Sequence, residues 1–155
     1  MARIAYSYEP KDETKAARAM GYEIPMSFKH AVEICRELKG KRIPQAMKFL
    51  EEVIEMRTPV PMRKYKKKVA HKNIPGWYAG RYPQKAAKEI LKVLKNLKAN
   101  AEYKGLNVEE LVIVHAQAKK GRCIVRYVPR AFGRAVPKRK QLTTVEFVAE
   151  VSEVK

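Results

Sequence analysis

The chain has 155 residues, of which 46% are hydrophobic, and a formal net charge of +18 at pH 7. This length is that of one domain, and this hydrophobic content excludes a wholly disordered polycation. No run of about 18 apolar residues occurs, and the first residues lack the apolar stretch of a signal peptide. We therefore expect a cytoplasmic protein without a membrane partner.

The positive charge is concentrated in two windows. Residues 56–88 contain ten Lys or Arg and residues 111–145 contain nine, and neither window contains Asp or Glu. The other 87 residues are almost neutral, with 15 basic and 16 acidic side chains. Solvated surfaces usually mix both signs, so two acid-free windows indicate a polyanionic partner, with nucleic acid favoured over an anionic membrane.

Two amphipathic helices are predicted in the first third of the chain. In SFKHAVEICRELKGK, residues 27–41, apolar side chains recur at helical spacing between a capping Ser27 and a terminating Gly40. In IPQAMKFLEEVIEM, residues 43–56, Pro44 suits the first turn and one face is apolar.

The next segment, residues 57–82 (the insert), is predicted to be an extended basic loop, because it contains prolines and glycines without periodicity. Loops of this length are uncommon without a role. Its cations are candidates for phosphate binding: Arg63, Lys64, Lys66, Lys67, Lys68, Lys72 and Arg81. Its aromatic side chains Tyr65, Trp77, Tyr78 and Tyr82 either stack on exposed bases or pack into the body, and the sequence leaves both open.

The longest helix is predicted over residues 83–105, opened by Pro83 and stopped by Gly105. After Leu111 the hydrophobic period changes to two, which predicts strands in LVIVHAQA, RCIVRYV and LTTVEFVAEV. The simplest arrangement is a long antiparallel hairpin whose far end is the basic stretch RYVPRAFGRAVPKRK. Its candidate RNA-binding cations are Lys119, Lys120, Arg122, Arg126, Arg130, Arg134, Lys138, Arg139 and Lys140.

These elements predict one α+β domain over residues 1–155, in which three helices pack on a small antiparallel sheet. The body comprises residues 1–118 and 142–155, and a basic β-hairpin (the arm) extends from it over about residues 119–141. An isolated two-stranded ribbon is marginally stable in water, and its like charges repel each other. The arm is therefore expected to lie inside a polyanion.

No catalytic or cofactor chemistry is indicated. His30, His71 and His115 lack the spacing of metal ligands, and His115 is expected to be a hydrogen-bonded histidine of the sheet. Cys35 and Cys123 have no CxxC partner and are expected to pack as small apolar side chains. The cationic windows contain no carboxylate for metal or proton handling. We expect no enzyme, no cofactor, no metal and no small-molecule substrate.

Three stretches resemble one known family. SFKHAVEICRELKGK followed by Arg42, Ile43 and Pro44, a helix ending NAEYKGL, and an arm containing PRAFGRA occur here in that order. This order resembles the universal family of large ribosomal subunit protein number twenty-two, and the likeness covers nearly the whole chain. The insert resembles the archaeal and eukaryotic branch, because bacterial members are shorter.

The resemblance implies a structural constituent of the large ribosomal subunit that supports assembly, with its hairpin threaded through rRNA and its tip lining the polypeptide exit tunnel. The implied partners are large-subunit rRNA, neighbouring large-subunit ribosomal proteins and the nascent polypeptide. By matching motif, the tunnel-facing residues are Arg130, Ala131, Phe132, Gly133, Arg134 and Ala135. Phe132 departs from the bacterial pattern, which usually has Lys at this place.

Two other function classes remain open at this point. An architectural DNA-binding protein also uses a basic β-arm with a proline near its tip, although such proteins usually dimerise to present paired arms. An RNA-processing enzyme would need a catalytic group that the cationic windows do not contain.

Overall fold

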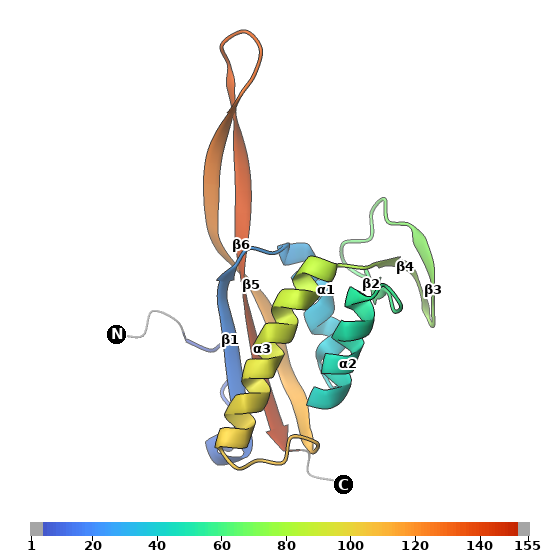
Figure 1. Cartoon of the computed structure of the whole chain (residues 1–155), viewed down its shortest axis with the longest axis vertical. Coiled ribbons are helices and arrows are strands. Elements are labelled where there is room, and N and C mark those ends of the chain that lie inside the picture. Colours follow the sequence, from blue (N-terminus) through green and yellow to red (C-terminus); the bar gives the residue numbers. More distant parts are fainter. Residues whose placement is uncertain (1–4, 152–155) are drawn as a thin grey trace.

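The computed structural model describes residues 5–151. The elements in chain order are a 3-10 turn (Glu13–Lys15), β1 (Ala16–Ile24), α1 (Phe28–Leu38), α2 (Ile43–Ile54), β2 (Val60–Pro61), β3 (His71–Ile74), β4 (Trp77–Arg81), α3 (Gln84–Tyr103), β5 (Leu111–Pro129) and β6 (Ala135–Val151). Figure 1 shows a body of helices beside a sheet, from which β5 and β6 continue as a long hairpin. The predicted α+β class, the three helices and the hairpin are confirmed. The body residues predicted at 1–4 and 152–155 lie outside the described residues.

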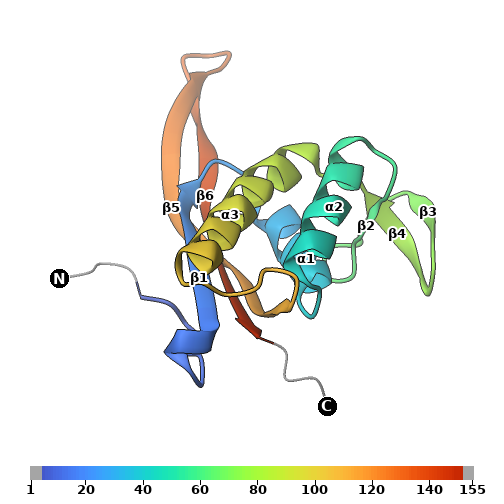
Figure 2. The ribbon, with the colours of Figure 1, turned by 60° about the horizontal axis from the view of Figure 1, so that its bottom comes forward.

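The main sheet has the strand order β1-β6-β5, and both pairings are antiparallel. The central strand β6 pairs Phe147 with Ala19 of β1 and with Ala116 of β5. The three helices lie on one side of this sheet, with α3 along β1 and α1 along β5 (Figures 1 and 2). Phe147, Leu94 and Ile34 are fully buried between the two layers and anchor the core. Full burial of such a side chain stabilises the fold by roughly 1.5–3 kcal/mol.

The helix ends follow the predicted signals. Ser27 is the N-cap residue of α1, although its side chain makes no capping hydrogen bond, and Gly40 and Gly105 adopt φ values of +86° and +71° just past the ends of α1 and α3. Glycine tolerates this left-handed conformation without the steric cost of a Cβ. Pro83 is the N-cap residue of α3, and Pro44 stands in the first turn of α2.

Strand β1 was not predicted, and it covers the edge of β6 that would otherwise be open. Its core face carries Ala17 and Ala19, which are too small to give a strong apolar alternation. On the face of β6 away from the helices, the N-terminal segment around Ser7 covers Glu146, whose side chain is fully buried. Residues 142–149 are therefore buried on both faces of the sheet.

The insert, predicted to be an extended loop, instead contains a second sheet with the strand order β2-β4-β3. Its strands are short: Val60 pairs with Arg81, Pro61 with Gly80, and Ile74 with Trp77. An added Cβ at Gly80 would come within 2.6 Å of Ile74 Cδ1, so the Ile74 side chain would have to shift to admit a larger residue there. The helices separate this sheet from the main sheet in both views (Figures 1 and 2).

Candidate nucleic-acid interface

The outer part of the arm is a two-stranded ribbon. The pairing of β1 with β6 ends where Ile24 meets Thr143, and beyond this point the arm continues from the pair Cys123 and Gln141 to the pair Pro129 and Ala135. Every residue from 122 to 140 is exposed to solvent. Figure 1 shows this ribbon projecting well beyond the body.

The arm reverses direction in a tight turn. The backbone N–H of Arg130 donates a 2.8 Å hydrogen bond to the carbonyl of Arg134. Between them Phe132 and Gly133 have φ values of +59° and +62°, a left-handed conformation that is unusual for phenylalanine. The Phe132 side chain is 95% exposed, so no intramolecular packing explains its place at the tip.

Like charges face each other across the arm. Arg126 is paired with Lys138, while Arg139 and Lys140 stand opposite Val125 and Ile124. Like charges at directly opposed positions destabilise a sheet, and no Asp or Glu occurs in residues 111–145 to offset them. The arm also exposes Tyr127, Val128 and Val136, which a free ribbon leaves in water. An anionic partner would offset the repulsion between these cations.

The base of the arm differs from its outer part, because two predicted RNA-binding cations form ion pairs with acids of this chain. Lys119 Nζ lies 2.7 Å from Glu146 Oε2, and Arg122 Nη2 lies 2.7 Å from Glu23 Oε2. These cations are already neutralised in place. They anchor the arm to the body.

Glu146 is the centre of a buried polar network that the sequence did not reveal. Besides Lys119, it is contacted by Ser7 through both its N–H and its hydroxyl, and His115 Nε2 lies 2.9 Å from its Oε1. Burial raises the pKa of Glu146, but hydrogen bonds from Lys119, Ser7 and His115 outweigh burial and hold the pKa below its ordinary value. The prediction that His115 is a hydrogen-bonded histidine of the sheet is confirmed.

The second cationic group lies on the insert. All seven of its predicted RNA-binding cations are exposed. Arg63 pairs with Glu37 of α1 at 3.2 Å, and Lys66 lies over the rings of Trp77 and Tyr78. The small sheet of the insert and the outer part of the arm lie on different sides of the helices (Figure 2). The chain therefore presents two distinct basic surfaces.

The structure distinguishes the roles of the insert aromatics. Trp77 is partly buried, and its Nε1–H donates a 3.1 Å hydrogen bond to the carbonyl of Met62, so it packs into the body. The ring of Tyr65 lies near the ammonium groups of Lys29 and Lys64, at 5.6 and 5.8 Å from its centroid. Tyr78 is 44% exposed and stacks on Trp77, which makes it the aromatic of the insert most open to a base.

The two cysteines differ in environment. Cys35 is buried, and this burial raises the pKa of its thiol to about 12, as expected for an inert apolar side chain. Cys123 is exposed on the arm, so the prediction that it packs as a small apolar side chain is wrong. Cys123 lies in the predicted arm, and both faces of a projecting ribbon meet solvent.

Within residues 5–151, no group of three or more His, Cys, Asp or Glu side chains is placed to hold a metal ion. None of the helices in the same part of the chain is both long and apolar enough to span a membrane.

Comparison with known proteins identifies the family. Residues 19–150 match the family model described as ribosomal protein L22p/L17e. A protein of Archaeoglobus fulgidus named large ribosomal subunit protein uL22 is 69% identical over 152 residues, which is 97% of this chain and 98% of that protein. Proteins of the same name from Methanocaldococcus jannaschii and Staphylothermus marinus are 53% and 45% identical, and each alignment covers at least 94% of this chain.

These relatives are all archaeal, in agreement with the branch that the insert indicated. Nearly complete coverage of both chains means that the likeness includes the arm and the insert as well as the body. This chain belongs to the ribosomal protein L22p/L17e family and is a structural protein of the large ribosomal subunit, not an enzyme.

Proposed function

We propose that the chain binds folded large-subunit rRNA through two surfaces, supports subunit assembly, and lines the polypeptide exit tunnel with the tip of its arm. As a ribosomal protein it works in the cytoplasm, within the ribosome. The observation that carries the proposal is the ribbon of residues 122–140, which is wholly exposed and has cations but no carboxylate. Such a ribbon gains stability when RNA phosphates surround it.

The two surfaces are defined by exposed cations that are candidates for phosphate binding. The arm surface comprises Lys120, Arg126, Arg130, Arg134, Lys138, Arg139 and Lys140, and the insert surface comprises Arg63, Lys64, Lys66, Lys67, Lys68, Lys72 and Arg81. Because they lie on different sides of the body, one protein can hold RNA segments that are distant from each other. This arrangement supports a role in assembly.

Electrostatic binding predicts how strongly the RNA-binding constant depends on salt concentration. If about eight cations neutralise phosphates, the logarithm of the binding constant falls against the logarithm of salt concentration with a slope of about −6 to −7. Filter binding of the purified protein to large-subunit rRNA at several salt concentrations tests this. A slope shallower than about −2 contradicts the proposal.

Recognition is expected to depend on RNA shape and 2′-hydroxyl groups, because neither surface shows an ordered set of base-reading side chains. The same filter assay with B-DNA of equal length provides the comparison. Equal affinity for B-DNA and rRNA would argue against recognition of RNA shape. It would favour the alternative of an architectural DNA-binding protein, which the ribosomal relatives do not support.

The tip, Arg130 to Ala135, is proposed to face the tunnel. Ala131 and Ala135 allow close approach of another chain, and Phe132 offers an uncovered apolar side chain. A photoreactive residue at position 132 in assembled ribosomes is expected to crosslink to the nascent polypeptide during translation. The same residue at position 103, where Tyr103 is 94% exposed at the end of α3, is the control. Crosslinking from position 103 alone contradicts the placement of the tip.

A further inference from the structure

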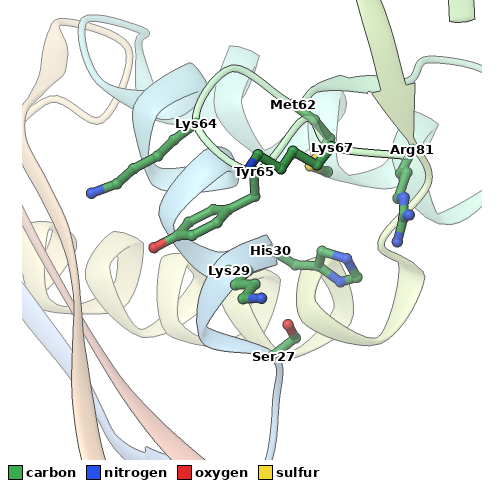
Figure 3. Close-up of a pocket in the computed structure, with 8 residues that line it drawn as sticks. All are labelled: Ser27, Lys29, His30, Met62, Lys64, Tyr65, Lys67 and Arg81. Carbon is green, nitrogen blue, oxygen red and sulfur yellow. The ribbon is translucent and has the colours of Figure 1, made fainter. Parts of the chain in front are cut away.

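A basic pocket lies between α1 and two parts of the insert, namely the segment that follows β2 and the strand β4 (Figure 3). It has a volume of about 620 Å³. Its lining residues are Ser27, Lys29, His30, Met62, Lys64, Tyr65, Lys67 and Arg81. A cavity of this volume accommodates a group of the size of a nucleotide. Its volume is larger than a single water molecule or ion needs.

All the charged side chains that line this pocket are positive. Lys29 comes from α1, Lys64 and Lys67 from the insert, and Arg81 from β4, and no carboxylate is among the lining residues. None of these four cations forms an ion pair with an acid in residues 5–151. Four cations brought together from three elements repel one another, so an anion bound between them would relieve the repulsion.

A buried carboxylate holds one wall of the pocket in place. Glu33 is fully buried on α1 and accepts hydrogen bonds from the backbone N–H groups of Lys64 and Tyr65, at 2.7 and 3.1 Å. Its other oxygen accepts a hydrogen bond from Arg36 at 3.3 Å. The carboxylate is thus used within the fold, and it fixes the backbone that carries Lys64 and Tyr65 beside the helix.

Two further groups shape the interior. Tyr65 lies with its ring near the ammonium groups of both Lys29 and Lys64, in a cation–π arrangement. Figure 3 shows His30 between Lys29 and Arg81. Burial, and next the charge of Arg81, lower the pKa of His30, so its imidazole is neutral near pH 7. A neutral imidazole offers one donor and one acceptor, which matches a ribose hydroxyl.

We propose that this pocket binds one nucleotide of large-subunit rRNA, with its phosphodiester among Lys29, Lys64, Lys67 and Arg81 and its ribose beside His30. The inference rests on the proposed function and names one contact within the insert surface. Arginine and lysine are the usual phosphate ligands of proteins, and a 2′-hydroxyl beside His30 gives the pocket a means to prefer RNA over DNA.

The first test compares two double variants. The pocket variant carries Lys67→Gln and Arg81→Gln, and the control variant carries Lys48→Gln and Lys95→Gln. Both pairs remove two exposed positive charges, but Lys48 and Lys95 lie on α2 and α3 outside the pocket. The pocket pair is expected to weaken rRNA binding about ten- to hundredfold, since charge-assisted hydrogen bonds are lost. It is also expected to reduce the steepness of the salt slope by about 1, and the control pair by much less.

Phosphate-ethylation interference identifies the contact itself. Ethylation of one rRNA phosphate should weaken binding of the wild-type protein and have no further effect on the pocket variant. If the wild-type protein binds rRNA with the steep salt slope but both variants bind alike, the pocket inference fails and the proposed function stands. If the wild-type protein does not bind rRNA, both fail.

The NMR signal of His30 separates the two sources of phosphate. An RNA oligonucleotide that carries the interfering phosphate should raise the pKa of His30, because the bound phosphate offsets the charge of Arg81. Matched DNA should raise it less. Inorganic phosphate that displaces the RNA at micromolar concentration would instead identify a free-anion site and overturn the inference.

Discussion

The guanidinium of Arg122 forms a paired contact with the carboxylate of Glu23, with Nη2 2.7 Å from Oε2 and Nε 3.1 Å from Oε1. The backbone N–H of Arg122 donates to the same carboxylate at 3.2 Å. Glu23 has a φ of +47° at the irregular end of β1, and Arg122 is the first residue of the exposed part of the arm. Together with the pair of Lys119 and Glu146, this contact holds the base of the arm on the body.

Replacing Glu23 with Gln should loosen the base of the arm. The charge-assisted bonds to Arg122 are lost, so the amides of Arg122 and Cys123 should exchange with solvent faster, while amides in α3 keep their protection. Hydrogen exchange measured by NMR tests this. Glu13→Gln is the matched control, because Glu13 also pairs with an arginine, Arg18, but away from the arm. Equal exchange in both variants contradicts the anchoring role of Glu23.

The depressed pKa of Glu146 predicts how stability depends on pH. Its carboxyl binds a proton at lower pH in the folded protein than in the unfolded chain, so the unfolded chain binds more protons between the two pKa values. The stabilisation is complete above the ordinary pKa of 4.5 and is lost as pH falls through the folded value. Thermal unfolding of Glu146→Gln should therefore show a weaker pH dependence below pH 4.5. If the melting temperatures of the variant and the wild-type protein fall in parallel below pH 4.5, the role of Glu146 in acid sensitivity is contradicted.

The core should respond strongly to truncation. Leu94 is fully buried on α3, and Leu94→Ala should lower the free energy of unfolding by about 2–5 kcal/mol through lost burial and a residual cavity. Tyr103 is 94% exposed on the same helix, and Tyr103→Ala should change stability by no more than about 0.5 kcal/mol. Chemical denaturation measures both. Similar costs for the two substitutions would mean that α3 does not pack as described.

The arginines of the tip should matter for RNA and not for the fold. Arg130 and Arg134 are exposed and lie on either side of the turn. The double variant Arg130→Ala with Arg134→Ala should weaken rRNA binding and leave the melting temperature of the body unchanged. A large fall in melting temperature of the free protein would show that these arginines belong to the fold.

The elements that the sequence predicted are those with strong periodicity. The apolar face of α3, with Ile90, Leu94 and Leu97, repeats at helical spacing over five turns, and β6 alternates over its body half. Strand β1 was not predicted, because its alanines and Gly21 give only a weak alternation of apolar and polar side chains. The second sheet was not predicted, because Pro61 and Pro75 are typical of a loop. The strands β2 and β4 pair nevertheless, since they are short and need few hydrogen bonds.

The candidate site was predicted in its charge and only partly in its contacts. Acid-free windows located the cations of both surfaces, because charge composition does not depend on tertiary structure. The sequence did not separate Lys119 and Arg122 from the free cations, since their partners Glu146 and Glu23 are distant along the chain. It also missed Glu33, because an acidic residue on an amphipathic helix usually faces solvent, and only the fold brings the insert over it.

The most direct test of the central claim is sedimentation of the tagged protein from its native cell on a sucrose gradient with magnesium. Stoichiometric migration with the large ribosomal subunit, resistant to moderate salt, is the expected result. Migration with chromatin, or as a small free protein at the same salt concentration, would contradict the claim that the two basic surfaces bind large-subunit rRNA.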